Sequence, residues 1–233
     1  MSAPLARNVL VVGASRGLGL EFVRQYRADG AKVTATARSD DGLAALAALG
    51  ARPLKLDVAD AASASGLAWQ IDGEAFDTVF YVSGVYGPRT DGLEPPSAGD
   101  FDAVMHTNVL GAMRVLPSLA DALAPPAGGR PGARIGVISS RMGSIGLRAG
   151  TAGWTYRASK AAVNSVLKDA SIAYAGRALC VAFHPGWVRT EMGGAGADID
   201  APESVAGMRH ALAALDASRN GSFLNYDGTP LAW

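Results

Sequence analysis

Residues 8–19 read Asn8-Val9-Leu10-Val11-Val12-Gly13-Ala14-Ser15-Arg16-Gly17-Leu18-Gly19, and this stretch decides the fold. The run 8–12 is short, apolar and rich in β-branched residues, which predicts a strand, and residues 17–28 have helical spacing. The three glycines between them leave the backbone bare, so that it could approach a pyrophosphate, whose charge a helix N-terminus favours. This order predicts a dinucleotide site that includes Gly13, Ser15, Arg16, Gly17, Leu18 and Gly19. The alternative is a tight turn without a ligand.

The rest of the chain alternates between strand-like and helix-like segments. Strands are predicted at residues 8–12, 32–37, 53–56, 78–82, 134–139, 178–184 and 222–226. Helices are predicted at residues 17–28, 41–49, 61–71, 101–123, 154–175 and 201–215. Alternation of this kind predicts an α/β fold: one Rossmann-type, doubly wound parallel sheet of about seven strands with helices on both faces. We expect residues 1–233 to form a single domain, with its ligands at the carboxyl edge of the sheet.

The composition and charge balance of the chain argue against several classes of function. The 233 residues are 49% hydrophobic, and 21 basic residues balance 21 acidic ones. No long basic run is present, which argues against nucleic acid or a membrane surface as the main partner. One cysteine and three scattered histidines offer no metal-binding pattern. No apolar signal core or membrane-length stretch is found, so a cytoplasmic protein is expected.

The end of the second predicted strand bears on which dinucleotide binds. An NAD site usually carries an acid there for the ribose 2′-hydroxyl, whereas an NADP site offers a cation to the 2′-phosphate. Here the strand ends without an acid, and Arg38 follows it, with Arg16 in the glycine turn as a second cation. NADP(H) is therefore favoured over NAD(H), although Asp40 and Asp41 keep NAD open.

Two residues after the third predicted strand complete the nucleotide end of the site. Asp57 would accept from the adenine amino group, and Val58 would cover the ring. A different role for Asp57 is to cap the helix that starts near Asp60.

The segment Tyr156-Arg157-Ala158-Ser159-Lys160 carries the chemistry. A spacing of four residues places the phenol and the ammonium on one face of a helix. A cation beside a phenol favours the phenolate, which would make Tyr156 usable as an acid or base near neutral pH. The alternative to this catalytic role is that Tyr156 lies on the helix surface, with Lys160 as a neighbour that extends its ammonium into solvent.

Together these motifs resemble the short-chain dehydrogenase/reductase family, in its classical branch, over essentially the whole chain. Within the family the chain is most similar to the C-factor/sniffer-like carbonyl reductases. The stretches that carry the resemblance are the glycine turn 13–19, Asp57, Ser83-Gly84, Asn108, Ser139 to Ile145, Tyr156 to Ala162, His184 to Gly194, Ser204 to Met208 and Phe223 to Gly228.

The resemblance implies a role for each catalytic residue. Tyr156 would protonate a carbonyl oxygen as hydride arrives, and Lys160 would lower the phenol's pKa and bind the nicotinamide ribose. Ser140 would donate to the developing alkoxide. Asn108 would hold a water that links Lys160 to solvent, unless it is only a polar packing residue.

The choice of serine stays open. Ser139 or Ser144 could replace Ser140, because the interval to Tyr156 is longer than the family's commonest spacing. The extra residues, around Gly150 to Gly153, would have to bulge outward.

The resemblance also assigns the rest of the cofactor site. Ser83 and Gly84 would leave room for the adenosine ribose, and Pro185-Gly186 would form the floor under the nicotinamide. Val188, through its backbone, and Thr190, through its hydroxyl, would hold the carboxamide.

The expected substrate is a small aldehyde, ketone or alcohol lying between residues 86–99, 141–154 and 191–200. Apolar walls are predicted from Tyr86, Met142, Trp154, Trp187 and Met192. A homodimer or homotetramer is expected through the helices predicted at residues 101–123 and 154–175. The competing hypothesis is a dinucleotide-binding regulatory or signalling protein of C-factor type with little turnover.

Overall fold

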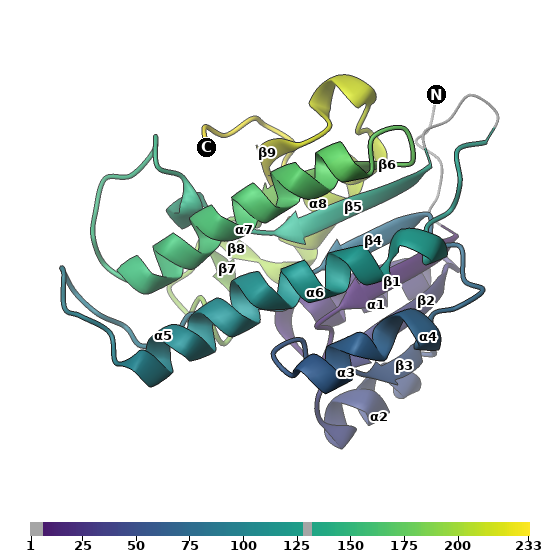
Figure 1. Ribbon diagram of the computed structural model, residues 1–233, viewed down its shortest axis with the longest axis horizontal. Coiled ribbons are helices and arrows are strands. Elements are labelled where there is room, and N and C mark those ends of the chain that lie inside the picture. Colours follow the sequence, from purple (N-terminus) through teal and green to yellow (C-terminus); the bar gives the residue numbers. More distant parts are fainter. Residues whose placement is uncertain (1–6, 128–131) are drawn as a thin grey trace.

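Seven parallel strands form one sheet in the computed structural model, which describes residues 7–127 and 132–233. Their order across the sheet is β3-β2-β1-β4-β5-β6-β9 (Figure 1). The strands are β1 Asn8–Val12, β2 Lys32–Ala37, β3 Arg52–Lys55, β4 Thr78–Tyr81, β5 Ala133–Ile138, β6 Ala178–His184 and β9 Ser222–Asn225. The order reverses between β1 and β4, and a crevice at such a point is where ligands bind in open α/β sheets.

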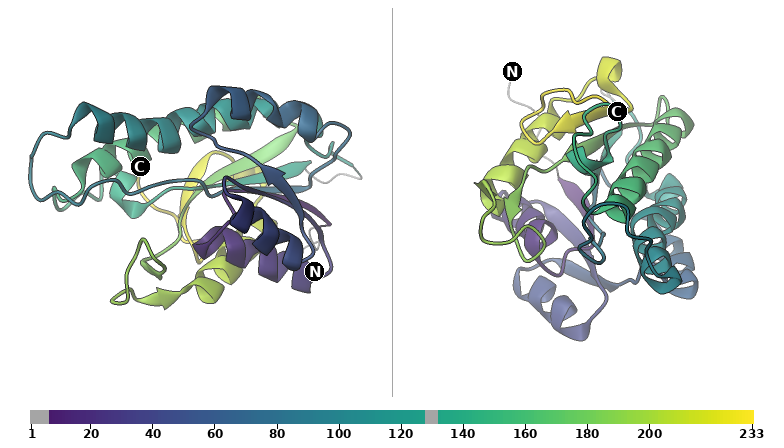
Figure 2. Two further views of the ribbon diagram at one scale, coloured as in Figure 1. Left: turned by 90° about the horizontal axis from the view of Figure 1, so that it is seen from below. Right: turned by 90° about the vertical axis from the view of Figure 1, so that its left-hand side faces the viewer.

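Helices cover both faces of this sheet, as Figure 2 shows from two directions. One face carries α1 Gly17–Ala28, α2 Asp40–Ala48 and α8 Ala201–Ala213. The other carries α3 Ala61–Ser65, α4 Leu67–Gln70, α5 Ala98–Met105, α6 Gly111–Ser118 and α7 Trp154–Ala173. The predicted fold class is confirmed.

Side-chain alternation along the buried strands produces two separate apolar cores. In β1, Val9 and Val11 pack under α1 and α8, whereas Leu10 and Val12 pack under α6 and α7. All four are fully buried, and each contributes about 1.5–3 kcal/mol relative to an exposed position. This two-sided burial is why the strands are nearly uniformly apolar rather than alternating with polar residues.

The prediction of one continuous helix at residues 101–123 is wrong. The structure divides it into α5, a π-helical turn His106–Leu110, α6 and a 3₁₀ turn Ala120–Ala122. Pro117 lies in the last turn of α6, where it cannot donate the backbone hydrogen bond that a continuing helix needs. The π-helical turn places Asn108 at 1% exposure inside the protein, and such turns are frequent at functional sites.

Other local differences have equally local causes. The helix predicted at residues 61–71 is broken at Gly66 into α3 and α4. A two-stranded parallel sheet, β7 Val188–Arg189 with β8 Ile199–Asp200, was not predicted, because each strand is only two residues long. Further 3₁₀ turns lie at Arg141–Gly143 and Ala217–Arg219. Within the described ranges, no helix combines the length and apolar character needed to cross a membrane.

Candidate active site

The glycine turn after β1 is packed too tightly for side chains. Gly13 has φ +86°, and a Cβ there would lie 2.4 Å from the Ser83 hydroxyl oxygen. A Cβ at Gly19 would lie 2.1 Å from the Gly13 carbonyl oxygen. The backbone amide of Gly13 donates to the Thr36 hydroxyl at 3.0 Å, which ties the turn to β2. The turn is therefore held against β2 and the end of β4, with its bare backbone at the start of α1.

A pocket of about 480 Å³ opens at this carboxyl edge. Most of the predicted site residues line it: Gly13, Ser15, Arg16, Gly17, Leu18, Arg38, Asp57, Val58, Ser83, Gly84, Tyr156, Lys160, Pro185 and Thr190. Five predicted residues do not form its lining, namely Gly19, Asn108, Ser140, Gly186 and Val188. Gly19 and Asn108 instead pack directly behind residues that do, and the others are described below.

Two ion pairs are formed by residues that line the pocket. An Arg38 guanidinium nitrogen lies 4.0 Å from an Asp57 carboxylate oxygen, and both side chains are partly exposed. Asp57 does not cap α3, because Asp60 does so by accepting from the Ser63 amide at 2.6 Å. Asp57 accepts instead from the Ala59 amide at 3.0 Å, which fixes its side chain beside the pocket. The first turn of α1 contains no acidic residue, so nothing there offsets its positive end.

The second ion pair was not predicted. Arg16 Nη1 lies 2.5 Å from a Glu191 carboxylate oxygen, and the side chains are 67% and 74% exposed. Both residues line the pocket. The pair therefore connects the glycine turn to the segment after β7, although the two residues are far apart in the sequence.

Tyr156 lies in the first turn of α7 and is 7% exposed. Burial raises the pKa of its phenol, the negative charge that Tyr86 would carry raises it further, and a hydrogen bond with the Ser140 side chain lowers it. The predicted lowering of this pKa by Lys160 is not found. Burial outweighs the other influences, and the Lys160 ammonium is 5.6 Å from the centre of the ring. At neutral pH the phenol holds its proton.

Lys160 lies one turn after Tyr156 and is 4% exposed. Its ammonium donates to the Ile138 carbonyl at the end of β5 at 2.9 Å. Burial lowers its pKa to about 8. A Cβ added at Gly84 would lie 3.2 Å from this ammonium, so the absence of a side chain there leaves the ammonium open to the pocket.

The three candidate serines have different partners. Ser140 is hydrogen-bonded to Tyr156. Ser139 lines the pocket, and its hydroxyl donates to the Asn164 side-chain oxygen in α7 at 2.5 Å. The Ser144 hydroxyl donates to the Ala232 carbonyl at 2.7 Å, close to the C-terminal residue. Only Ser140 among these serines contacts the phenol.

Asn108 connects three elements in the protein interior. Its side-chain amide donates to the Val85 carbonyl and to the Ser159 hydroxyl, both at 2.9 Å, and its oxygen accepts from the Val85 amide at 2.8 Å. A Cβ at Gly84 would lie 3.3 Å from that oxygen. Asn108 therefore shapes the chain after β4 and lies beside the space that the Lys160 ammonium also borders.

The segment after β6 forms the opposite wall. Gly186 has φ +84°, and a Cβ there would lie 2.6 Å from Ile199 Cδ1, so the turn requires glycine. The Pro185 carbonyl accepts from the Ser204 hydroxyl at 2.5 Å, which anchors the wall to α8. Val188 is buried in β7, and the Thr190 hydroxyl accepts from the Gly193 amide at 3.2 Å.

Sequence reasoning foresaw Tyr86 only as an apolar wall and missed Arg89. The Tyr86 ring stacks on the Tyr156 ring, with centres 4.6 Å apart. The Arg89 guanidinium carbon lies 5.1 Å from the centre of the Tyr86 ring, and the guanidinium donates to the Met192 carbonyl at 3.0 Å. Tyr86, Arg89 and Met192 all line the pocket. Nothing in the sequence around Arg89 marks it, because its position depends on how the loop after β4 folds.

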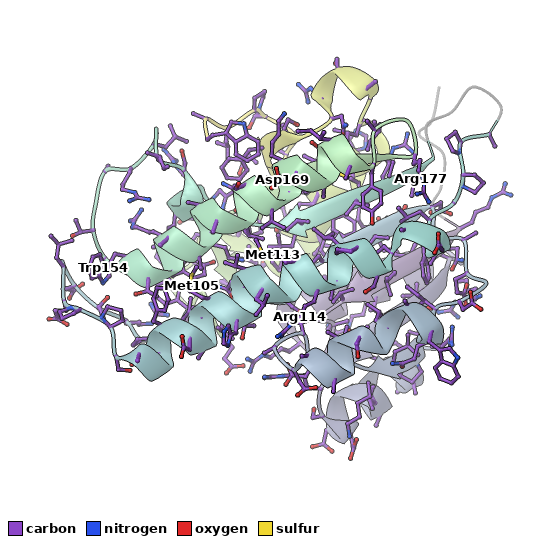
Figure 3. All side chains as sticks on the ribbon, in the orientation of Figure 1. Met105, Met113, Arg114, Trp154, Asp169 and Arg177 are labelled. Atoms are coloured by element: carbon purple, nitrogen blue, oxygen red, sulfur yellow. The ribbon has the colours of Figure 1, made fainter. Side chains whose placement is uncertain are left out.

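The longer interval before Tyr156 docks on that same loop. The Gly153 amide donates to the Thr90 carbonyl at 2.9 Å, and the Trp154 indole donates to the Glu94 carbonyl at 2.9 Å. Figure 3 shows Trp154 at the start of α7, beside this loop. Residues 145–152 are exposed, as an outward bulge requires, but Gly153 is buried against the Tyr86 hydroxyl. Trp187, another predicted wall, is 53% exposed and does not line the pocket.

Comparisons with known proteins agree with this geometry. The sequence profile of the family "short chain dehydrogenase" matches residues 7–198. The chain is 36% identical over 129 residues to C-signal of Myxococcus xanthus. The aligned region covers 54% of this chain and 74% of that protein.

Solved structures resemble the whole chain. The carbonyl reductase Sniffer of Drosophila melanogaster superposes with a TM-score of 0.87 and 28% identity, covering 97% of this chain and 99% of that one. An NADPH-bound carbonyl reductase from chicken fatty liver superposes with a TM-score of 0.86 and 30% sequence identity, and the match covers 97% of this chain and 94% of that one. The predicted resemblance to C-factor and sniffer-like proteins is confirmed, and the chain belongs to the short-chain dehydrogenase/reductase family of oxidoreductases.

Proposed function

We propose that this protein interconverts a carbonyl compound and an alcohol with NADP(H), using Tyr156 as the acid and base. The observation that carries the proposal is the buried Tyr156, hydrogen-bonded to Ser140 and one helical turn from Lys160, at the wall of a pocket that begins at a glycine turn. A surface tyrosine would have none of these partners. These three side chains and the glycine turn would fill the roles that hydride chemistry needs from a protein.

The residues around the pocket fit a dinucleotide. Side chains at Gly13 and Gly19 would collide with Ser83 and with the Gly13 carbonyl, so glycine at both positions keeps the turn in the tight shape expected of a pyrophosphate site. Arg16 and Arg38 would hold the 2′-phosphate, which favours NADP(H) over NAD(H). The NADPH-bound chicken enzyme, similar along nearly the whole chain, supports this choice. Asp57 and Val58 would bind the adenine, and Lys160, Pro185, Val188 and Thr190 the nicotinamide end.

The bound nicotinamide would supply or accept the hydride. In the reduction, Tyr156 would give its phenolic proton to the carbonyl oxygen, and burial keeps that proton in place at neutral pH. Ser140 would donate to the same oxygen as its negative charge develops. Lys160, open toward the pocket beside Gly84 and Asn108, would stabilise the phenolate left behind and pass it a proton from solvent.

A comparison of wild type with Tyr156→Phe tests the proposal. Both proteins are offered aldehydes, ketones and alcohols with NADPH or NADP⁺, and absorbance of the reduced nicotinamide is followed. We expect the phenylalanine variant to lose about 10²-fold or more in kcat, while its Kd for NADPH, measured by fluorescence, changes little. Unchanged turnover in the variant would refute the role of Tyr156.

A signalling role is the second candidate, and the similarity to C-signal is the observation that favours it. Such a protein would need the nucleotide site but not the phenol. Comparing the biological output of a wild-type strain with one that carries Tyr156→Phe separates the two functions. Loss of output supports the enzyme, and full output supports the regulator.

We further propose a homodimer or homotetramer built on α5, α6 and α7. Met113 on α6 is 51% exposed and Ile172 on α7 is 66% exposed, and Figure 3 shows Met113 on the outer side of its helix. Light scattering at micromolar concentration tests this assembly, and a monomer would exclude it.

A further inference from the structure

The charged side chains that line the pocket are not equivalent. Arg16 is paired with Glu191, Arg38 lies beside Asp57, and the Lys160 ammonium is buried against a backbone carbonyl. Arg89 remains. Across the described ranges, no carboxylate lies within ion-pair distance of its guanidinium. Its one hydrogen bond goes to an uncharged acceptor, the Met192 carbonyl, at 3.0 Å.

The position of Arg89 relates it to the reacting end of the pocket. The Tyr86 ring stacks on Tyr156 at 4.6 Å and holds the Arg89 guanidinium carbon at 5.1 Å from its own centre. The cation–π contact and the Met192 bond hold the guanidinium at this end of the pocket. It is therefore no farther from the Tyr156 ring than these two separations together, a span that one small molecule can bridge.

From this arrangement we infer that the substrate carries an acidic group, and that Arg89 binds it while the carbonyl faces Tyr156. The inference rests on the proposed function, whose substrate class it specifies. A guanidinium offers several N–H donors in a planar fork, and a carboxylate accepts two of them at once. Such a charge-assisted pair is stronger than the bond to the Met192 carbonyl, so an acidic substrate would displace that contact.

The surrounding charges support an anion rather than a cation. The two carboxylates that line the pocket, Asp57 and Glu191, each lie beside an arginine that offsets their charge. Around Tyr156 and Tyr86 the pocket lining includes two basic residues, Arg89 and Lys160, and the uncharged Met192. A cationic substrate would be repelled by Arg89 and Lys160, whereas both carboxylates of the lining are already paired with arginines.

A matched pair of substrates tests the inference. The aldehyde 4-carboxybenzaldehyde carries the acid, and its methyl ester does not. We expect wild type to prefer the acid in kcat/KM, and Arg89→Gln to lose about tenfold or more on the acid but little on the ester. Arg89→Lys should recover part of the loss, because it restores the charge without the fork. Arg148→Gln removes the same charge from an exposed loop residue outside the pocket and should behave as wild type.

Direct binding keeps the test independent of turnover. Calorimetry measures the Kd of 4-(hydroxymethyl)benzoate in wild type and in Arg89→Gln, and we expect weaker binding in the variant by a similar factor. Equal losses on acid and ester, or an unchanged Kd, would overturn the assignment, and neither outcome would count against carbonyl reduction by the wild-type protein. A matching loss of NADPH affinity in Arg89→Gln would assign the residue to the nucleotide and also overturn it. Failure of both substrates in wild type would count against the proposed function, and the Kd would still decide the role of Arg89.

Discussion

Arg16 and Glu191 form a 2.5 Å ion pair that joins the glycine turn to the segment after β7. Both residues line the pocket, and the arginine is one of the two expected to hold the 2′-phosphate of NADP(H). The Glu191 carboxylate therefore competes with that phosphate for the same guanidinium.

Glu191→Gln should bind NADPH more tightly than wild type. An exposed ion pair is worth only about 0.2–1 kcal/mol, so we expect the Kd for NADPH to fall by a factor of about 1.4 to 5 at low salt. Fluorescence titration measures it. In an Arg16→Gln background the same substitution should have no effect, because the competition then no longer exists. A gain that persists in this background would show that Glu191 acts by another route.

Arg38→Gln should shift the cofactor preference. The guanidinium is 65% exposed and lies beside Asp57, so its loss removes a cation that the 2′-phosphate needs and NADH does not. We expect kcat/KM with NADPH to fall about tenfold and that with NADH to change little. NADH serves as the control within the same protein, and an equal fall for both cofactors would contradict the assignment.

The three serines after β5 should respond differently to alanine. Ser140→Ala removes the hydroxyl bonded to Tyr156 and should lower kcat by about 10²-fold, with a stability cost of about 1 kcal/mol because the same hydroxyl accepts from the Met142 amide. Ser139→Ala breaks the contact with Asn164 and Ser144→Ala breaks the contact with Ala232. These two should lower the melting temperature more than kcat. Steady-state kinetics and thermal unfolding separate the outcomes, and a catalytic loss confined to Ser139→Ala would reverse the choice of serine.

His184 should make the protein sensitive to mild acid. Burial lowers the pKa of its imidazole from 6.5 to about 4, and the Arg141 charge acts in the same direction. The unfolded chain therefore binds a proton between pH 6.5 and about 4 that the folded protein does not, so stability falls as pH decreases through this window. The loss is up to about 3 kcal/mol. Urea unfolding of wild type and His184→Asn measures it, and parallel pH profiles for the two proteins would contradict the expectation.

Gly13→Ala tests whether close packing in the glycine turn requires glycine, and Gly30→Ala, outside that turn, is its control. Both glycines have positive φ, +86° and +80°, but a Cβ at Gly30 meets nothing within 4 Å. We expect Gly30→Ala to cost only the backbone strain, about 1–2 kcal/mol. Gly13→Ala should cost about 1–3 kcal/mol more, because its Cβ collides with Ser83. Urea unfolding gives both values, and equal values would show that close packing does not select this glycine.

The sequence by itself determined the fold class and most of the candidate site. Apolar runs such as 8–12 and 178–184 are buried on both faces of a parallel sheet, and parallel strands bring their carboxyl ends to one edge whatever the details of packing. Motifs that follow those strands, such as Gly13 to Gly19 or Pro185-Gly186, were therefore placed near one another before any contact was known.

Only the tertiary structure decided the contacts that depend on loops and on burial. The stack of Tyr86 on Tyr156, the position of Arg89 and the Arg16–Glu191 pair join segments whose separation in sequence carries no periodic signal. The π-helical turn at Asn108 occurs where its side chain bonds to the Val85 backbone, a contact that helix propensity does not encode. The pKa of Tyr156 was expected to fall because a lysine follows it by one turn, yet it rises. Desolvation depends on everything packed around the phenol, which a linear spacing does not show.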